Sequence, residues 1–226
     1  MKYDEISIPT YVINLPKRVE RRQSIENEFK GRKEFELHIV EATRHEIGAV
    51  GLWKSIKGII QEVVSKNEDD VIIICEDDHI FTESYQRDLF ISQICRAAQL
   101  NTQILFGGIG GYENAVKISD DMFWIDWNWC TQFMVVFKPA FEKILKARFT
   151  KRDVADEFLS KIISNKIVLY PFISRQKEFG YSDVTAKNNE VGTISNLFYE
   201  TEKRLAKNII INDKYNAVFS KKELLF

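Results

Sequence analysis

The stretch VIIICEDDHI, residues 71 to 80, contains the signals that decide the fold. Residues 71–75 are continuously apolar and mostly β-branched, which is typical of a strand buried on both faces of a parallel sheet. Three acids, Glu76, Asp77 and Asp78, follow directly. Adjacent carboxylates repel one another, so they need a positively charged partner. The stretch therefore predicts a central strand with a charged site at its carboxyl end.

Strand and helix patterns alternate on both sides of this stretch. Strands are predicted at residues 10–15, 35–42, 71–75, 103–108, 131–137 and 166–173, and helices at residues 18–33, 51–66, 84–100, 139–149, 153–164 and 196–208. This alternation predicts an α/β fold, with a mostly parallel sheet covered by helices on both faces. We expect residues 1–185 to form the main domain and residues 186–226 to be an extension packed on it. The tail after residue 208 is ambiguous.

Composition narrows the class of protein. Of the 226 residues 45% are hydrophobic, which indicates a globular chain, and the net charge of −1 gives no overall attraction for nucleic acid. The three cysteines lack CxxC spacing and fit reduced thiols in a cytoplasmic protein. Acids precede the first apolar stretch, so we expect no signal peptide, and no apolar run reaches the ~20 residues of a transmembrane helix. Peripheral association with the inner face of a membrane stays open.

The three acids predict a metal site. In open α/β sheets, ligands bind outside the carboxyl ends of the strands, which is where Asp77 and Asp78 would lie. Carboxylate oxygens suit Mg²⁺ or Mn²⁺, and such an ion can bridge the phosphates of a nucleotide. The alternative interpretation is a solvated acidic turn, or acids placed at a helix N-terminus.

A second polar group follows the first predicted strand. In INLPKRVERR, Asn14 lies at the strand end, and Arg18, Arg21 and Arg22 follow on the predicted helix. Arginine binds phosphate oxygens through two parallel hydrogen bonds, so these residues could face the same sheet edge as the acids. The alternative is a basic helix surface. Because Arg21 and Arg22 are adjacent, they cannot both face the site, and we expect at least one of them to be solvated.

Six stretches, in order, resemble glycosyltransferase family 25, the lipooligosaccharide and procollagen galactosyltransferase relatives. They are YVINLPKRVERR (11–22), GAVGLWKSIKGII (48–60), VIIICEDDHIF (71–81), CTQFMVVFKPAFEKIL (130–145), DVADEFL (153–159) and YPFISRQKEFGYSDV (170–184). The resemblance implies a GT-A fold and the inverting transfer of a hexose, such as galactose, from a nucleotide sugar, with UDP and Mn²⁺ or Mg²⁺ as the expected nucleotide and metal. It implies a glycan or glycolipid acceptor, such as a surface polysaccharide or lipooligosaccharide. The chain departs from the family at Leu52 and Ile56, where the family has cysteine and histidine.

The resemblance also implies roles for individual residues around the donor. It assigns Asp78 to the metal and Glu76 to the sugar nucleotide, and it leaves Asp77 between these two roles. It places four residues around the nucleotide sugar: Asn14, Arg18, Arg21 and Gln176.

An inverting transfer also needs a general base on the acceptor side. The resemblance points to Asp156, on a short predicted helix, with Asp183 in reserve. The alternatives are an ordinary aspartate at the start of a helix and a residue that only shapes the closing loop.

Three further features have plainer interpretations. GGIGG (107–111) lacks the dinucleotide-binding spacing, and we interpret it as a flexible loop beside the site. Trp127 and Trp129 fit a core or an interface, with stacking on an acceptor sugar as the alternative. His79 should point away from the acids because neighbours in an extended segment face opposite ways, and His45 shows no partner and is interpreted as ordinary.

Two rival functions follow from the same residues. Because the family histidine is absent, the chain could be a relative with a weakened site that acts as a binding or assembly protein. Other metal enzymes on α/β sheets are disfavoured. INLPKR has no glycine-rich loop for a nucleotidyltransferase, and TYVINLP has no DxD pattern for an aspartyl-phosphate phosphatase.

Overall fold

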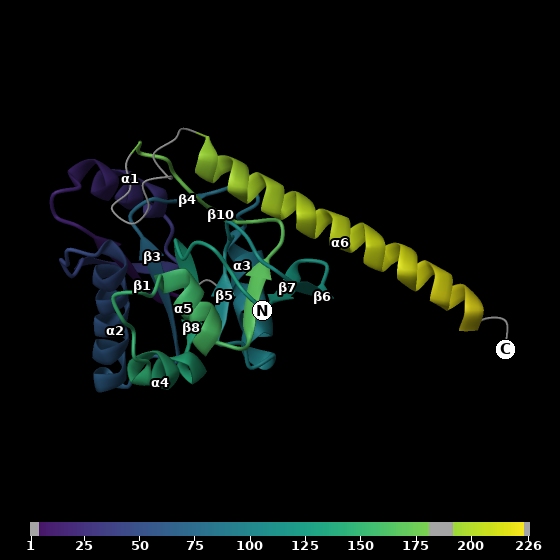
Figure 1. Ribbon diagram of the computed structural model, residues 1–226, viewed down its shortest axis with the longest axis horizontal. Helices are drawn as coiled ribbons and strands as arrows, with labels where there is room; N and C mark the ends of the chain where they lie inside the picture. Colours follow the sequence, from purple (N-terminus) through teal and green to yellow (C-terminus); the bar gives the residue numbers. More distant parts are fainter. Residues whose placement is uncertain (1–4, 181–191, 224–226) are drawn as a thin grey trace.

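The computed structural model describes residues 5–180 and 192–223, with side chains to residue 217. An eight-stranded sheet forms its centre, in the order β2-β1-β3-β8-β5-β9-β7-β6 (Figure 1). The strands are β1 (Ile8–Asn14), β2 (Phe35–Glu41), β3 (Val71–Glu76), β4 (His79–Phe81), β5 (Ile104–Phe106), β6 (Ala115–Ser119), β7 (Met122–Ile125), β8 (Phe133–Phe137), β9 (Lys166–Leu169) and β10 (Ser174–Gln176). The helices are α1 (Val19–Phe29), α2 (Gly48–Lys66), α3 (Arg87–Gln99), α4 (Lys138–Lys146), α5 (Ala155–Ile162) and α6 (Thr193–Glu223).

The first half of the sheet is parallel, as the sequence predicts. β1 pairs in parallel with β2 on one side and with β3 on the other. The register sets Ile13 beside Glu76, so β1 and β3 end at the same level. The segments that follow Asn14, Glu41 and Glu76 therefore leave the sheet at one common edge.

The second half of the sheet corrects the prediction of a mostly parallel sheet. Three of the seven pairings in the large sheet are parallel and four are antiparallel, because β8 runs against β3 and β5, and β7 runs against β9 and β6. All five residues of β8 are buried. A strand buried on both faces gives a continuous apolar run in either orientation, so its sequence carries no sign of direction.

Helices cover both faces of the sheet and bury two apolar clusters, as predicted. Alternate residues of β3 enter opposite clusters: Ile72 and Ile74 pack with α2, α4, α5 and α6, whereas Ile73 and Cys75 pack with α1 and α3. Each fully buried aliphatic side chain contributes roughly 1.5–3 kcal/mol. These two layers hold the strand ends rigidly at the edge where β1 and β3 stop.

The glycines of residues 107–111 are buried, which corrects the interpretation of this stretch as a flexible loop. A Cβ on Gly108 would lie 2.1 Å from the carbonyl oxygen of Ser174, and one on Gly110 would lie 2.8 Å from the Sγ of Cys130. Glycine is needed here because neighbouring segments approach too closely for a side chain.

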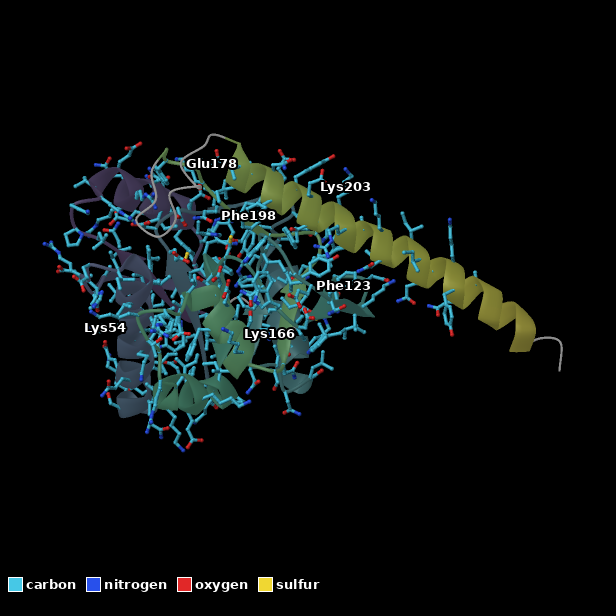
Figure 2. All side chains as sticks on the ribbon, viewed as in Figure 1. Lys54, Phe123, Lys166, Glu178, Phe198 and Lys203 are labelled. Carbon is cyan, nitrogen blue, oxygen red and sulfur yellow. The ribbon has the colours of Figure 1, made fainter. Side chains whose placement is uncertain are left out.

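The last helix, α6, extends well beyond the helix predicted at 196–208 and includes the ambiguous tail as far as Glu223. Its first half is buried through Ile194, Phe198 and Leu205, and Figure 2 labels Phe198 where the helix crosses the body of the protein. Its second half extends beyond the rest of the molecule (Figure 1). Within the described ranges, no helix combines the length and apolar content that crossing a membrane requires.

Candidate active site

Arginine side chains surround the acids at the end of β3. The Nη1 of Arg21 donates to the Oδ1 of Asp77 at 3.2 Å and to the Oδ2 of Asp78 at 3.1 Å. Arg18 reaches the Oδ1 of Asp77 at 3.5 Å, and the Nδ2 of Asn14 donates to its Oδ2 at 2.9 Å. The predicted meeting of the early polar residues with the acids therefore occurs, and protein cations provide the positive charge that the acids need.

The helical geometry of α1 explains why only one of the two adjacent arginines takes part. Arg21, Ile25 and Phe29 are the buried residues of α1, spaced four apart along one face. The side chain of Arg22 is 53% exposed and its Nε donates to Glu26, one turn further along the helix. The expectation that one of these arginines is solvated is confirmed.

Asp78 has one satisfied and one unsatisfied carboxylate oxygen. Its Oδ2 accepts hydrogen bonds from Arg21 and, at 2.8 Å, from the Nε2 of Gln176. Its Oδ1 is buried and has no hydrogen-bond partner among the described residues. Burial and the charge of Asp77 raise the pKa of Asp78, against the lowering influence of Arg21.

Glu76, the last residue of β3, is partly exposed. The Oγ1 of Thr131, at the start of the segment leading into β8, donates to its Oε1 at 2.8 Å. Burial and the charge of Asp78 raise the pKa of Glu76, and the hydrogen bond from Thr131 opposes this rise. The charges of Glu76 and Asp78 therefore act on each other.

The carboxylates fit a divalent ion that is shared with a ligand. No group of three histidine, cysteine or acidic side chains suited to a metal occurs in the part of the chain that the structure describes. Mg²⁺ is commonly bound by one or two carboxylates together with substrate phosphates, which matches Glu76 and the unsatisfied Oδ1 of Asp78. Both oxygens of Asp77 accept hydrogen bonds from the protein, so Asp77 lies on the arginine side of the cluster.

A pocket of about 410 Å³ opens beside the acids. It is lined by Ile13, Leu15, Lys17, Arg18, Ala42, Thr43, Arg44, His45, Glu46, Gly48, Gly51, Leu52, Glu76 and Asp77. Arg44 and His45 were not predicted as site residues, and both lie among the lining residues of this pocket. Their position directly after a strand parallel to β1 is the signal that could have identified them.

Two small residues of α2, Gly51 and Ser55, lie against the segment that lines this pocket. The Oγ of Ser55 accepts a hydrogen bond from the backbone N–H of Thr43 at 2.8 Å, and a Cβ on Gly51 would lie 2.6 Å from the carbonyl oxygen of Thr43. These residues therefore let the segment after β2 pack tightly on the helix. Leu52 lines the pocket, whereas Ile56 is buried in the apolar core and is not among the lining residues.

Asp156 lies near Glu76, at the start of α5. Its Oδ2 accepts a hydrogen bond from the backbone N–H of Cys130 at 3.1 Å, and its Oδ1 accepts one from Glu157 at 2.8 Å. Its charge contributes to raising the pKa of Glu76, and burial raises the pKa of Asp156 itself. The reserve base, Asp183, lies outside the described residues.

Two other expectations concern side chains around the site. The Nδ1 of His79 lies 2.8 Å from the Oγ of Ser174, and the ring stacks on Phe133, so the expectation that His79 points away from the acids is confirmed. Trp129 is exposed and contacts Trp127 edge to face, with the ring centres 4.9 Å apart. Exposed indole surface therefore lies one residue before Cys130, which Asp156 binds.

Comparison with known proteins supports the architecture. No family model and no curated protein sequence matches the chain. Protein A197 from STIV shares the fold, with a TM-score of 0.53 and 11% identity over 79% of this chain and 87% of that one. Lower similarity is found to apo UDP-glucose pyrophosphorylase (TM-score 0.45, 9% identity, 88% of this chain and 82% of that one). A glycosyltransferase that acts in glycosylation of the major capsid of PBCV-1 gives a TM-score of 0.44 with 15% identity, over 72% of this chain and 81% of that one.

The predicted α/β class is confirmed, with the correction that the sheet is mixed, and its GT-A-like character stays a prediction. Membership of glycosyltransferase family 25 stays a prediction.

Proposed function

We propose that this protein is a glycosyltransferase that uses a nucleotide-sugar donor, with UDP-hexose as the expected donor. The observation that carries the proposal is the cluster of acids and arginines at the ends of β1 and β3, three of whose members, Arg18, Glu76 and Asp77, line a pocket. The loop between β1 and α1 contains no glycine-rich phosphate cradle, and this favours transfer of a sugar over nucleotidyl transfer.

Charge balance supports a diphosphate ligand bound together with a cation. Asp77 and Asp78 are already compensated by Arg18 and Arg21. A diphosphate adds negative charge beside Glu76, so its binding requires added positive charge. Glu76 and the Oδ1 of Asp78 would hold Mn²⁺ or Mg²⁺, which neutralises charge on a departing diphosphate when bound.

Side chains of the pocket would bind the rest of the donor. Lys17, Arg18 and Arg44 place positive charge along the pocket wall, where phosphate oxygens can accept their hydrogen bonds. Asp77, held by Asn14 and Arg21, offers a fixed carboxylate toward a ribose or sugar hydroxyl. These fixed groups would align the donor before transfer.

On the acceptor side, we assign the general base to Asp156. Burial raises its pKa, which makes the carboxylate a stronger acceptor for the proton of a sugar hydroxyl. Trp129 precedes Cys130, whose backbone N–H donates to Asp156, and its exposed face offers a stacking surface for a glycan or glycolipid acceptor.

The alternative function is a catalytically weakened relative that acts as a binding or assembly protein. It was suggested by the loss of the family histidine at Ile56. That side chain is buried in the apolar core, so its replacement leaves the polar lining of the pocket intact. The burial of Ile56 therefore favours the enzyme over the weakened relative.

Thermal unfolding with and without ligands tests the proposal. We expect UDP with Mn²⁺ at about 100 times its dissociation constant to raise the Tm by about 5–10 °C, since only the folded protein binds it. Asp78→Asn should remove this metal-dependent shift. Asp120→Asn, at a side chain that is 97% exposed in the β6–β7 turn, should keep it.

Product analysis then separates the candidate reactions. We expect release of UDP from a UDP-hexose in the presence of a glycan acceptor. Formation of diphosphate from UTP and a hexose 1-phosphate would overturn the proposal in favour of a nucleotidyltransferase. Full metal-dependent binding of UDP by Asp78→Asn would show that the site is assigned to the wrong residues.

A further inference from the structure

A short segment after β9 contacts Asp78 at two points. The Nε2 of Gln176 donates to the Oδ2 of Asp78 at 2.8 Å, and the backbone N–H of Lys177 donates to its carbonyl oxygen at 2.6 Å. Gln176 is the last residue of β10, which pairs antiparallel with β4 alone. A two-stranded ribbon of three residues per strand is weak, and its register needs support from elsewhere.

Helix α6 supplies this support before Gln176. The Oε1 of Glu202 accepts a hydrogen bond from the backbone N–H of Phe172 at 2.8 Å, and its Oε2 accepts one from the Nη2 of Arg175 at 2.5 Å. One carboxylate thus fixes the chain on entry to β10 and also the side chain next to Gln176. The bond to Arg175 is charge-assisted and therefore stronger than a neutral one.

Helix α6 is also joined to the segment after Gln176. The carboxylate of Glu178 accepts hydrogen bonds from the backbone N–H groups of Gly192 and Ser195, at 2.6 and 2.9 Å. Gly192 directly precedes α6 and Ser195 lies in its first turn, so Glu178 caps the N-terminal end of this helix, near which Figure 2 labels it. The residues in contact with Asp78 are therefore bracketed on both sides by contacts to one helix.

Phe179 links the same segment to the arginine side of the site. Its ring lies over the guanidinium of Arg21, with the Cζ atom 4.8 Å from the ring centre. Arg21 in turn contacts Asp77 and Asp78. A displacement of this segment would therefore disturb both the Gln176 and the Arg21 contacts of Asp78.

We propose that Glu202 is a positioning residue for donor binding. By holding Phe172 and Arg175, it keeps β10 in the register that places the Gln176 amide on Asp78, which orients the other oxygen of that carboxylate toward the cation. This inference rests on the proposed function and extends it, because it gives helix α6 a role in positioning residues of the donor site.

A double-mutant cycle tests this role. In the wild-type background, Glu202→Ala should weaken Mn²⁺-dependent binding of UDP, measured by titration calorimetry, by about 10- to 100-fold, as is usual for residues that orient a metal ligand. In a Gln176→Ala background, Glu202→Ala should cause little further loss, because its effect passes through Gln176. Glu200→Ala, on the same helix but at a side chain paired with exposed Lys203, should bind UDP like the wild type.

Each other outcome overturns the inference in a recognisable way. Equal weakening in both backgrounds would mean that Glu202 only stabilises the fold. If Glu202→Ala binds UDP as tightly as the wild type, Glu202 is not a positioning residue, and the proposed glycosyltransferase function is unaffected. If the wild-type protein itself does not bind UDP, both the role of Glu202 and the proposed function are wrong.

A second variant covers the case in which Glu202→Ala does not fold. Glu202→Gln retains an acceptor for the Phe172 N–H and removes only the charge opposite Arg175. The same comparison between the two Gln176 backgrounds applies to it.

Discussion

The two halves of the sheet bury positive charge in different ways. In the parallel half, Arg21 is 4% exposed and lies between the carboxylates of Asp77 and Asp78. In the mixed half, Lys166 is 1% exposed, and its Nζ donates to the backbone carbonyls of Ser160 and Ile163. The first cation has charged partners beside a pocket, and the second has helix carbonyls inside the core.

This difference separates a site that can bind a ligand from a structural support. The cluster around Arg21 contains acids whose charge a ligand or an ion can alter. Lys166 instead caps the C-terminal end of α5, where the helix dipole favours positive charge. Since α5 carries Asp156 at its other end, we expect Lys166 to serve the site only by holding this helix in place.

The largest effect should follow removal of the charge between the two acids. We expect Arg21→Gln to lower the free energy of unfolding by about 3–5 kcal/mol at pH 7, because it leaves buried carboxylates without their shared partner. Urea denaturation monitored by fluorescence measures this loss. A loss below about 1 kcal/mol would contradict the view that the charge is compensated internally.

The pH dependence sharpens this prediction. The pKa of Asp78 is raised from its ordinary value, so its ionisation costs stability as the pH rises through the folded pKa. Arg21 lowers this pKa, so the variant should lose more stability than the wild type as the pH rises. The difference between them should shrink toward about pH 4, where the carboxyl group is protonated.

Replacement of Lys166, in the mixed half of the sheet, should have an intermediate effect on stability, and this effect should depend on pH. Burial lowers the pKa of Lys166 from 10.5 to about 8. The unfolded chain then binds the proton more tightly than the folded protein, so the wild type gains stability between about pH 8 and 10.5. We expect Lys166→Met to lack this gain, which amounts to roughly 3 kcal/mol at about 1.4 kcal/mol per pKa unit.

Urea denaturation across this pH range measures the effect, and Lys161→Met is its matched control. Lys161 is exposed in the last turn of α5, so its replacement should leave the pH profile parallel to that of the wild type. If the free energy of unfolding of Lys166→Met also runs parallel to that of the wild type across this pH range, burial of the charged Lys166 amine costs no stability. The two halves would then not differ as described.

The sequence predicted the parallel half of the molecule well because its signals are local. The apolar run of β3, the acids after it and the early arginines all belong to continuous stretches, and their meeting at one edge follows from parallel strands. The mixed half was predicted less well. Because β8 is fully buried, its sequence does not indicate in which direction the strand runs. The close packing at Gly108 depends on segments that are distant in the chain.

The same limit applies to the site. Arg44 reaches the pocket only because of the way the chain folds. Glu202 reaches the segment around Gln176 from a helix that lies outside the six stretches that resemble the family. Neither residue stands in a local motif, so only the packing of distant elements reveals its place. By contrast, Arg21 could be narrowed down to one of two residues because helical geometry separates adjacent side chains.

The smallest effect should come from the neighbour of Arg21. Arg22 forms an exposed ion pair with Glu26 one turn along α1, and solvent and salt screen such pairs. We therefore expect Arg22→Gln to cost about 0.2–0.5 kcal/mol, with the difference vanishing in 1 M salt. Adjacent arginines on one helix would thus differ about tenfold in their contribution to stability. If Arg22→Gln lowers the free energy of unfolding as much as Arg21→Gln does, the total charge of α1 determines stability, and the buried position of Arg21 has no special effect.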